Sequence, residues 1–591
     1  MSILLPLSPA VTRRWIPIAF AACVAALLIA GGFMQLPARL VFKDPDEAMR
    51  LVQVRDFLAG QSWHDLVPHR LDPSFDRPMH WSRFIDLSMT ALYWPLSLIM
   101  KPEHAERAMA IIWPPLTLVL CAIPLTMIAR RFGGMRAALT TVILCCGVAS
   151  LWQFLPGRID HHSVQMAAAL FAIAFTIQRS TPWSAGLAGV MTALALSLGI
   201  ETLPYLLILA CFFAVDWIAG QRLPSVRAYV IATGASATAF FALNVAPRFW
   251  TYTACDVLTF NFLAGIVVGS IGLYGASRWA ELRPVSRTSR VMVCALVILG
   301  ALGTSLAIEP RCAWGVIGTF DPSIRPLWFN HIVEVTTAFT IAVIQPSYAF
   351  TSFALPMVAL LVIAMRGHLM LRRDDGRIVL TCFAAALLVA LLQIRGAFYA
   401  NVFAALIIGP ALVSYAQRWT PLRRFETAPL VLAIVLLVLV PVLPRLTMHI
   451  TTAEASQGPA ATDPIPTACR SSDSFATLAT LPQGLVLAPV DTGPFILLNT
   501  QHAVVSGPYH RFDRGIVLGQ SILYKMSLSE AHAALLRRGI TYVAICEADM
   551  GGRLATALAK DRPLWAQEVS SADAPLRIFR IVQEGQASAA P

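Results

Sequence analysis

The chain has 591 residues, of which 57% are apolar and 13% charged, and its mean hydropathy is +0.66. A soluble globular protein has about a quarter of its residues charged, so this composition excludes a soluble globule and indicates a polytopic membrane protein. The formal charge of +12 does not indicate a nucleic-acid partner, because the basic residues fall in short clusters between apolar stretches.

Apolar stretches long enough to cross a bilayer recur from the N-terminus to about residue 450. Since a span needs roughly 20 apolar residues, we expect about thirteen spans. They lie near residues 15–36, 107–129, 135–155, 163–179, 183–200, 202–218, 226–246, 258–277, 289–308, 338–365, 378–394, 396–416 and 427–446. The first lacks a small-residue cleavage site and is expected to be an uncleaved anchor.

Arginines set the predicted orientation. They are concentrated in alternate loops, so the positive-inside rule predicts a multi-pass protein of the cytoplasmic (inner) membrane with its N-terminus in the cytoplasm. The loop after the first span, residues 38–106, and the tail then lie on the extracytoplasmic (periplasmic) side.

The loop at 38–106 is unusually acidic for so apolar a chain. Its segment DPDEAMRLVQVRDFLAG predicts an amphipathic helix at the outer face, with Asp46 at its start. Asp46 could equally be the N-cap of that helix, and this alternative stays open. Residues 87–100 are apolar but short, which predicts a re-entrant or interfacial helix.

Ionisable residues also mark three later outer turns. The segment LPGRIDHHSVQ places Arg158, Asp160, His161 and His162 in one short turn, where charges are costly unless they line a site. Asp and His are metal ligands as well. Glu334 lies in the outer loop at 308–346. Arg395 is the only charge between two long apolar spans, so it requires an anion, either a carboxylate or a lipid phosphate.

The tail begins with a Pro/Ala/Thr-rich linker at residues 451–467. After it, GLVLAP, HAVVSG, TYVAIC and LRIFRI predict strands, and Ser527 with Glu530 predicts a capping box for a helix. Residues 468–591 are therefore expected to form a small α/β domain. Its two cysteines, Cys469 and Cys546, could form a disulfide in an oxidising compartment, or both could be packed thiols. Seven other cysteines fall in spans and are expected to be packing residues: Cys23, Cys121, Cys145, Cys146, Cys211, Cys294 and Cys382.

Taken together, these motifs resemble the catalytic subunit of oligosaccharyltransferases, which are membrane glycosyltransferases of the GT-C class. Asp44-Pro45-Asp46 matches the first acidic motif of that family, and Asp160-His161-His162 matches the second in its archaeal DHH form. Ile332-Val333-Glu334 loosely matches the TIxE motif, and Arg395 matches the arginine that binds lipid phosphate. The resemblance covers the chain to about residue 450 well and the tail poorly.

The tail departs from the family at its acceptor motif. The nearest match to WWDYG is Pro489-Val490-Asp491-Thr492-Gly493, which lacks both tryptophans and the tyrosine. In the family this motif holds the Ser or Thr of the glycosylated sequon, so its loss puts protein N-glycosylation in doubt. The nearby polar residues Tyr509, His510 and Arg511 could contact donor or acceptor, or form an ordinary polar loop.

The resemblance implies an α-helical polytopic GT-C-like domain at 1–450, with catalytic outer loops at 38–106, 156–162 and 308–346. It implies transfer of a sugar from a polyprenyl phosphate or diphosphate to a protein, polysaccharide or lipid acceptor. The alternatives left open are a transferase acting on lipid A, a polysaccharide or another lipid instead of protein, a transporter, and a non-catalytic scaffold.

The chemistry of such a transfer assigns roles to the candidate residues. A phosphate leaving group needs a Lewis acid and a fixed cation beside it. We expect Mg²⁺ or Mn²⁺, and inversion at the anomeric carbon, because nothing in the sequence indicates a dedicated nucleophile. The expected catalytic residues are Asp46, Asp160 and Glu334; the metal ligands are Asp46, Asp160, His162 and Glu334; the donor phosphate binds Arg395 and Arg158; and further substrate contacts come from Asp44, His161, Asp491, Tyr509, His510 and Arg511.

Overall fold

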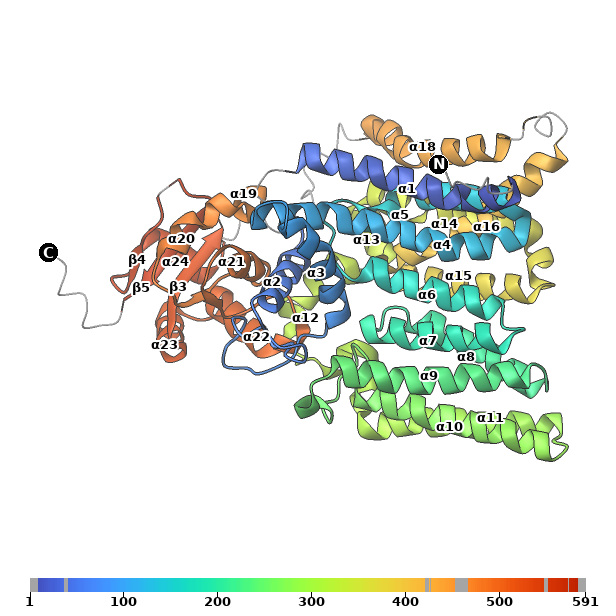
Figure 1. Cartoon of the computed structure of the whole chain (residues 1–591). Helices are drawn as coiled ribbons and strands as arrows, with labels where there is room; N and C mark the ends of the chain where they lie inside the picture. Colours follow the sequence, from blue (N-terminus) through green and yellow to red (C-terminus); the bar gives the residue numbers. More distant parts are fainter. Residues whose placement is uncertain are drawn as a thin grey trace. The chain divides into compact units, whose positions relative to one another are not determined.

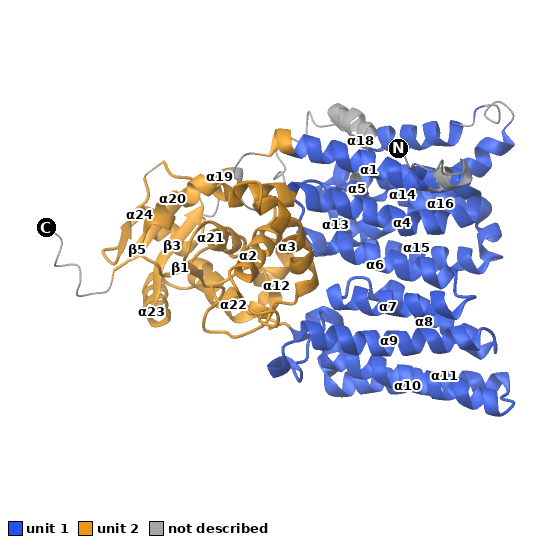
Figure 2. Cartoon of the chain, in the orientation of Figure 1, with its two compact units in different colours: residues 1–32, 111–319, 333–457 blue, residues 33–110, 320–332, 458–591 orange. Residues whose placement is uncertain are grey.

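The chain forms two compact units (Figure 2). The structure, a computed structural model, describes residues 9–36, 41–419, 425, 427–451, 466–546, 551–571 and 573–582. The first unit comprises residues 1–32, 111–319 and 333–457, and the second comprises residues 33–110, 320–332 and 458–591. The acidic loop after the first helix therefore belongs to the same compact unit as the tail. Most of the predicted linker, residues 452–465, lies outside the described residues.

Long apolar helices that lie side by side make up the first unit (Figure 1). Eight helices among the described residues are long and apolar enough to cross a membrane, and four further apolar helices are shorter. Each predicted span overlaps one of these helices, while the number of crossings stays a prediction. The eight long and four shorter helices are α1 (Pro9–Gln35), α4 (Pro102–Cys145), α6 (His162–Ile177), α7 (Pro182–Leu198), α8 (Leu203–Ile218), α9 (Leu223–Asn244), α10 (Phe260–Leu282), α11 (Arg287–Ile308), α14 (Pro346–Leu371), α15 (Asp374–Leu392), α16 (Ala397–Arg418) and α18 (Ala428–Thr451).

Two breaks in the helices have reasons that are visible in the sequence. Helix α4 is two helical arms joined at Gly133–Gly134, where Gly134 has φ 67°, a conformation that favours glycine. A second break separates α13 (Ala338–Ile344) from α14 at Gln345. The residue before a proline is disfavoured in the α region, and Gln345, which precedes Pro346, has ψ 65°.

Short elements connect the helices of the first unit. They are α5 (Val148–Leu151), η1 (Trp152–Phe154), η2 (Pro247–Phe249), η3 (Pro310–Thr319), η5 (Val333–Val335) and η6 (Ile394–Gly396).

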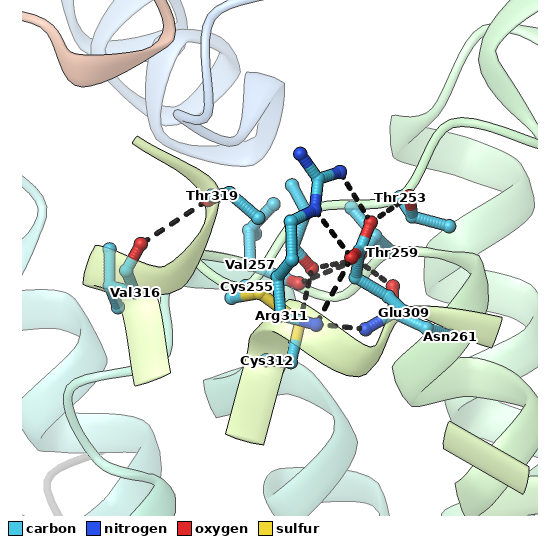
Figure 3. The surroundings of a disulfide bond; sticks show 11 residues. Thr253, Cys255, Val257, Thr259, Asn261, Glu309, Arg311, Cys312, Val316 and Thr319 are labelled. Carbon is cyan, nitrogen blue, oxygen red and sulfur yellow. Dashed lines mark hydrogen bonds and ion pairs between the residues drawn. A yellow bond between two sulfur atoms is a disulfide. The ribbon is translucent and has the colours of Figure 1, made fainter. Parts of the chain in front are cut away.

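A disulfide that the sequence analysis did not anticipate joins the segment before α10 to η3 (Figure 3). Cys255 and Cys312 have Cα atoms 5.3 Å apart, so the bridge closes the open end of the α10–α11 hairpin. Beside it, the Arg311 Nε donates to the Glu309 Oε1 at 2.7 Å, and the Thr253 hydroxyl donates to the Glu309 Oε2 at 2.6 Å. Hydrogen bonds from Arg311 lower the pKa of Glu309 to about 2, so the pair is ionised at neutral pH.

The second unit contains a five-stranded sheet with strand order β2-β1-β3-β5-β4. Strand β1 is parallel to β2 and β3, and β5 is antiparallel to β3 and β4. The strands are β1 (Leu485–Leu487), β2 (Ala503–Val504), β3 (Ile540–Cys546), β4 (Ala566–Glu568) and β5 (Leu576–Ile581). The four predicted strands are confirmed, whereas β4 was missed because its sequence AQE has no apolar run.

Helices make up much of the rest of the second unit. They are α2 (Pro45–Leu58), α3 (Arg83–Ser97), α12 (Ile324–Leu327), η4 (Phe329–His331), α19 (Thr467–Arg470), η7 (Ser472–Phe475), α20 (Ala476–Thr480), η8 (Val490–Thr492), α21 (Gly493–Asn499), η9 (His510–Phe512), α22 (Asp513–Gln520), η10 (Ser521–Lys525), α23 (Leu528–Arg538) and α24 (Arg553–Lys560). The capping box of Ser527 and Glu530 begins α23 as predicted. The Cys469–Cys546 disulfide is confirmed, with Cα atoms 6.1 Å apart.

Helix α2 was predicted to be an amphipathic helix lying at the outer face, and the structure differs from this prediction. Every residue from Glu47 to Val54 is buried, on all sides of the helix. Burial of Arg50 is offset because its Nη1 donates to the Asp86 Oδ1 at 2.8 Å. The second unit thus encloses the middle of α2, and the Arg50 guanidinium is paired inside the protein instead of facing water.

Candidate active site

A tight turn before α6 carries the first cluster of candidate residues. Gly157 has φ 91° in this turn, a conformation that favours glycine, and the Arg158 N–H donates to the Leu155 carbonyl at 3.0 Å. The chain then enters α6 with His161 as its N-cap residue. Asp160 and His161 are buried in this turn.

Asp160 holds both neighbouring histidines. Its Oδ1 accepts a hydrogen bond from the His161 backbone N–H at 2.6 Å and lies 2.5 Å from the His161 Nδ1. Its Oδ2 lies 3.1 Å from the His162 Nε2, and the two imidazole rings have centroids 4.4 Å apart. The structure therefore brings together Asp160 and His162, which the sequence predicts to share a role.

The donor atoms of this turn fit a divalent cation. One ligand atom from each of Asp160, His161 and His162 lies within 4.8 Å of the others. A carboxylate with imidazole nitrogens is a donor set that first-row divalent metals accept. Asp160 and His162 were predicted as ligands, and His161 lies beside them.

Glu201, which the sequence analysis did not single out, lies next to this turn. It sits between α7 and α8, and its Oε2 accepts a hydrogen bond from the Gln165 Nε2 at 2.9 Å. Its Oε1 lies 3.7 Å from the His161 Nε2. A sequence signal for it exists, because Glu201 is the only charged residue between Arg179 and Asp216, a stretch that is otherwise apolar and neutral. The reasoning that identified Arg395 would have found Glu201 too.

These contacts change the acidity of two groups. Burial by itself would lower the pKa of His161, but the neighbouring Asp160 and Glu201 carboxylates raise it to about 10. Burial by itself would raise the pKa of Glu201, yet the neighbouring His161 imidazole and the other nearby charges hold it well below its usual range. The site therefore contains closely paired opposite charges at neutral pH.

Arg395 lies in η6 and points at the same carboxylate. Its Nη2 is 3.2 Å from the Glu201 Oε1, so of the two anions predicted for Arg395 the structure shows a carboxylate. Tyr399, one turn further along the chain, donates its hydroxyl to the Gln165 Oε1 at 3.4 Å. Residues from four segments of the first unit thus form one connected network.

Glu334 is brought near this network by a backbone contact. The Ile394 N–H donates to the Thr336 carbonyl at 2.9 Å, which joins the turn containing Glu334 to the turn containing Arg395. Glu334 then lies within electrostatic range of Arg395. Arg158 is buried, with its guanidinium 5.4 Å from the centre of the Trp152 ring, and its assignment to the donor phosphate stays a prediction.

The remaining candidates belong to the second unit. Asp44 is the N-cap of α2, because its carboxylate accepts the Asp46 N–H at 3.0 Å and its own N–H donates to Glu47 at 3.0 Å. The N-cap alternative considered for Asp46 is therefore wrong, since Asp46 lies in the first turn of the helix. Its predicted roles in catalysis and metal binding remain predictions.

Within this unit the polar tail residues contact the acidic loop and its neighbours. The Tyr509 hydroxyl donates to the Pro45 carbonyl at 3.2 Å, and the Arg511 Nη1 donates to the Pro78 carbonyl at 3.0 Å. The His510 ring stacks on Phe320, with centroids 4.8 Å apart. Asp491 lies in η8 and is half-buried. Their predicted substrate contacts remain predictions.

Comparison with known proteins shows the fold but gives no match in sequence. No protein-family model and no curated protein matches the chain. The chain is similar in structure to the oligosaccharyltransferase of Archaeoglobus fulgidus in its apo form, with a TM-score of 0.65, 16% identity, and coverage of 97% of this chain and 76% of that one.

Two complexes of the Archaeoglobus fulgidus enzyme give the same result. The complex with an inhibitory peptide and a dolichol-phosphate matches with a TM-score of 0.64 and 15% identity over 96% of this chain and 74% of that one. The complex with Zn and sulfate matches with a TM-score of 0.57 and 15% identity over 92% and 71%. The resemblance seen in the motifs is thus confirmed in the fold: this chain is an α-helical polytopic membrane protein with the GT-C fold of the archaeal oligosaccharyltransferase.

Proposed function

We propose that this protein is a glycosyltransferase that moves a sugar from a polyprenyl phosphate or diphosphate to an acceptor at the membrane surface. The observation that supports the proposal is the network of Asp160, His162, Glu201 and Arg395, which brings side chains suited to bind a metal close to a cation suited to bind a phosphate, at the ends of apolar helices. A solved structure of the archaeal enzyme, which has the same fold, is a complex with an inhibitory peptide and a dolichol-phosphate.

The candidate residues have different proposed roles in the sugar transfer. Asp160 and His162 would hold a divalent cation, Mg²⁺ or Mn²⁺, which would stabilise the charge on the leaving phosphate as a Lewis acid. Arg395 binds a phosphate oxygen of the donor and fixes its position. Glu334, which is exposed and close to the Arg395 turn, is suited to orient the acceptor and to take its proton. Attack on the face opposite the phosphate gives inversion.

The acceptor is proposed to be a lipid, such as lipid A, or a polysaccharide, with a protein as the second candidate. An acceptor peptide with an NVT sequon has been tethered to the archaeal enzyme. In this chain, the corresponding tail segment reads PVDTG and lacks the aromatic residues of WWDYG. A site without those residues has lost the family's means of holding a sequon.

The proposed location is the cytoplasmic membrane, with the site on its periplasmic side. Two disulfides support this orientation, one in each unit, because structural disulfides persist in oxidising compartments. Cys312 lies at the end of the α10–α11 hairpin that the arginine pattern predicts to be outside. The tail carrying Cys469 and Cys546 is predicted to lie on the same side.

The first test is chemical. Glycolipids and polysaccharides from a deletion strain, analysed by mass spectrometry, should lack one sugar that returns with the wild-type gene. In liposomes, Asp160→Asn and exhaustive chelation should each lower sugar transfer by on the order of 100-fold, because both remove stabilisation of the leaving phosphate. Glu281→Gln, which alters an exposed ion pair elsewhere in the first unit, should transfer sugar at the wild-type rate.

The same experiment separates the alternatives. A transporter would move labelled lipid or solute without breaking a glycosidic bond, and a scaffold would tolerate Asp160→Asn. Full turnover after chelation, with restored Mg²⁺ or Mn²⁺ making no difference, would contradict the metal assignment. Unchanged glycans in the deletion strain together with no transfer in liposomes would contradict the transferase itself.

A further inference from the structure

A basic pocket lies at the turn that joins the two arms of α4. This open pocket has a volume of about 600 Å³ and is lined by Arg130, Arg131, Gly134, Met135 and Arg373. Arg130 and Arg131 lie near the end of the first arm of α4, and Arg373 reaches the pocket from the loop between α14 and α15. Three of the five lining residues are therefore arginines, and they come from two turns that lie 242 residues apart in the chain.

Arg373 is fixed in its orientation. Its Nε and Nη2 donate to the two carboxylate oxygens of Asp375 at 2.9 and 2.7 Å, and its Nη2 also donates to the Arg131 carbonyl at 3.1 Å. The Arg373 guanidinium lies 5.4 Å from the centre of the Phe132 ring. These contacts join the two turns, so the arginines of both turns stay at one pocket.

Several hydrogen-bond donors of these arginines remain available to a ligand. Arg131 faces Asp375 with its Nε, at 3.7 Å. Among the described residues, no partner hydrogen-bonds to the Nη groups of Arg131, to the Nη1 of Arg373 or to the guanidinium of Arg130. The side chains of Arg131 and Arg373 are 47% and 50% exposed, whereas Asp375 is buried. Three arginines and one carboxylate give the pocket a net charge of +2.

The pocket lies where two apolar helices end. Helices α4 and α14 are both long and apolar enough to cross a membrane. In the last turn of α14, Leu369 and Leu371 are exposed, so apolar surface directly precedes Arg373 in the chain. The arginine pattern predicts that this end of the helices faces the cytoplasm. The Asp160 turn follows the other end of the second arm of α4, after α5 and η1.

We propose that this pocket binds the headgroup of an anionic phospholipid, with a preference for a headgroup that carries two phosphates. The guanidinium fork binds phosphate oxygens in pairs, and basic pockets between membrane helices bind such headgroups. The net charge of +2 matches two singly charged phosphates, as in cardiolipin. The inference goes beyond the proposed function and does not depend on it, because the pocket contains none of the candidate active-site residues.

The positive-inside rule by itself accounts for arginines at this end of the helices. It does not require that they converge on one pocket, or that Asp375 and Phe132 fix one of them. A second arginine pair provides the comparison. Arg283 and Arg287 lie at the turn between α10 and α11, are exposed, and are not part of the pocket.

The test measures lipid binding to the full-length protein in detergent micelles by native mass spectrometry. Cardiolipin, phosphatidylglycerol and phosphatidylethanolamine with the same acyl chains are titrated separately. The double variant Arg130→Gln, Arg131→Gln should bind cardiolipin at least about tenfold more weakly, and phosphatidylglycerol should be affected less, because two cations are removed. Binding of the zwitterionic phosphatidylethanolamine should stay unchanged. The matched control Arg283→Gln, Arg287→Gln removes the same charge and should bind all three lipids like the wild type.

The outcomes separate a specific site from general attraction between charges. Equal weakening of cardiolipin binding by the two double variants would show that only the summed charge matters, and the inference would be overturned. Unchanged cardiolipin binding in Arg130→Gln, Arg131→Gln would overturn it too, as would an equal loss for phosphatidylethanolamine. Displacement of cardiolipin by an equal concentration of inorganic phosphate would identify a soluble anion, and not a lipid, as the ligand.

Folding is monitored by the thermal unfolding midpoint, which should be the same for every variant. If the double variant is unstable, Arg130→Gln alone carries the test, because Arg130 is exposed and has no partner among the described residues. It should weaken cardiolipin binding several-fold, and wild-type affinity in that variant would overturn the inference.

Discussion

Asp86 neutralises two arginines that are buried inside the second unit. Its Oδ1 accepts from the Arg50 Nη1 at 2.8 Å and its Oδ2 accepts from the Arg83 Nη1 at 3.0 Å, and all three side chains have no solvent exposure. The Arg50 guanidinium also lies 4.3 Å from the centre of the Trp81 ring. A buried charge is tolerated only when it is paired, so the stability of this part of the unit depends on Asp86.

Replacing Asp86 should therefore destabilise the protein far more than replacing an exposed carboxylate. Asp86→Asn leaves two buried cations without a counter-charge, which costs about 3–5 kcal/mol of unfolding free energy. Glu103→Gln, at an exposed position, is the control and should change stability by less than about 0.5 kcal/mol. Urea unfolding in detergent, followed by tryptophan fluorescence, measures both, and equal midpoints for the two variants would contradict the argument.

At the scale of elements, the two helices of the α10–α11 hairpin pack against each other along their length. A disulfide joins the segments at the open end of the hairpin. A Cβ on Gly265 would lie 2.8 Å from the Ala301 carbonyl oxygen, so the two helix backbones approach closely there. The disulfide Cys255–Cys312 instead constrains η3, which follows the hairpin and has no buried residue. Helix packing and loop order thus depend on different contacts.

The double variant Cys255→Ser, Cys312→Ser should loosen the loop and leave the helices intact. Hydrogen exchange by mass spectrometry should show amides of residues 310–319 exchanging about tenfold faster, which corresponds to about 1.4 kcal/mol of lost protection. Amides of α10 and α11 should exchange as before. Cys211→Ser, at an exposed cysteine in α8, is the matched control. Faster exchange in the helices would show that the bridge also holds the hairpin together.

At the scale of the whole molecule, the cysteines divide into free and disulfide-bonded groups. Seven of the eleven cysteines are free, and all seven are the ones predicted to pack within spans. The other four form one disulfide in each unit. This division agrees with a protein whose outer segments face an oxidising compartment.

Thiol titration of the protein purified from its own membrane should reproduce that division. Unfolded in detergent without reductant, the protein should expose seven thiols, and after reduction all eleven. Cys469→Ser should release Cys546 and add one thiol to the unreduced count. Eleven thiols before reduction would mean that the bridged segments face a reducing compartment, and the proposed periplasmic orientation would be lost.

The sequence by itself determined the features that depend on local pattern. Apolar runs predicted the helices, because each residue makes its own contribution to the free energy of transfer into a bilayer. These contributions add along the chain. Alternating residues predicted four strands of the tail, and the Ser527–Glu530 spacing predicted the start of α23. The Asp160-His161-His162 motif was recognisable because its three members are adjacent in the chain.

Only the tertiary structure decided which distant turns meet. Arg395 contacts Glu201, which is 194 residues away, and Cys312 bridges to Cys255 across a whole hairpin. The burial of α2 was also missed, because Arg50 is acceptable inside the protein only with Asp86, which lies 36 residues further on. Hydrophobic periodicity describes one element at a time, whereas these pairings follow from how side chains of many elements pack together, and no local pattern carries that information.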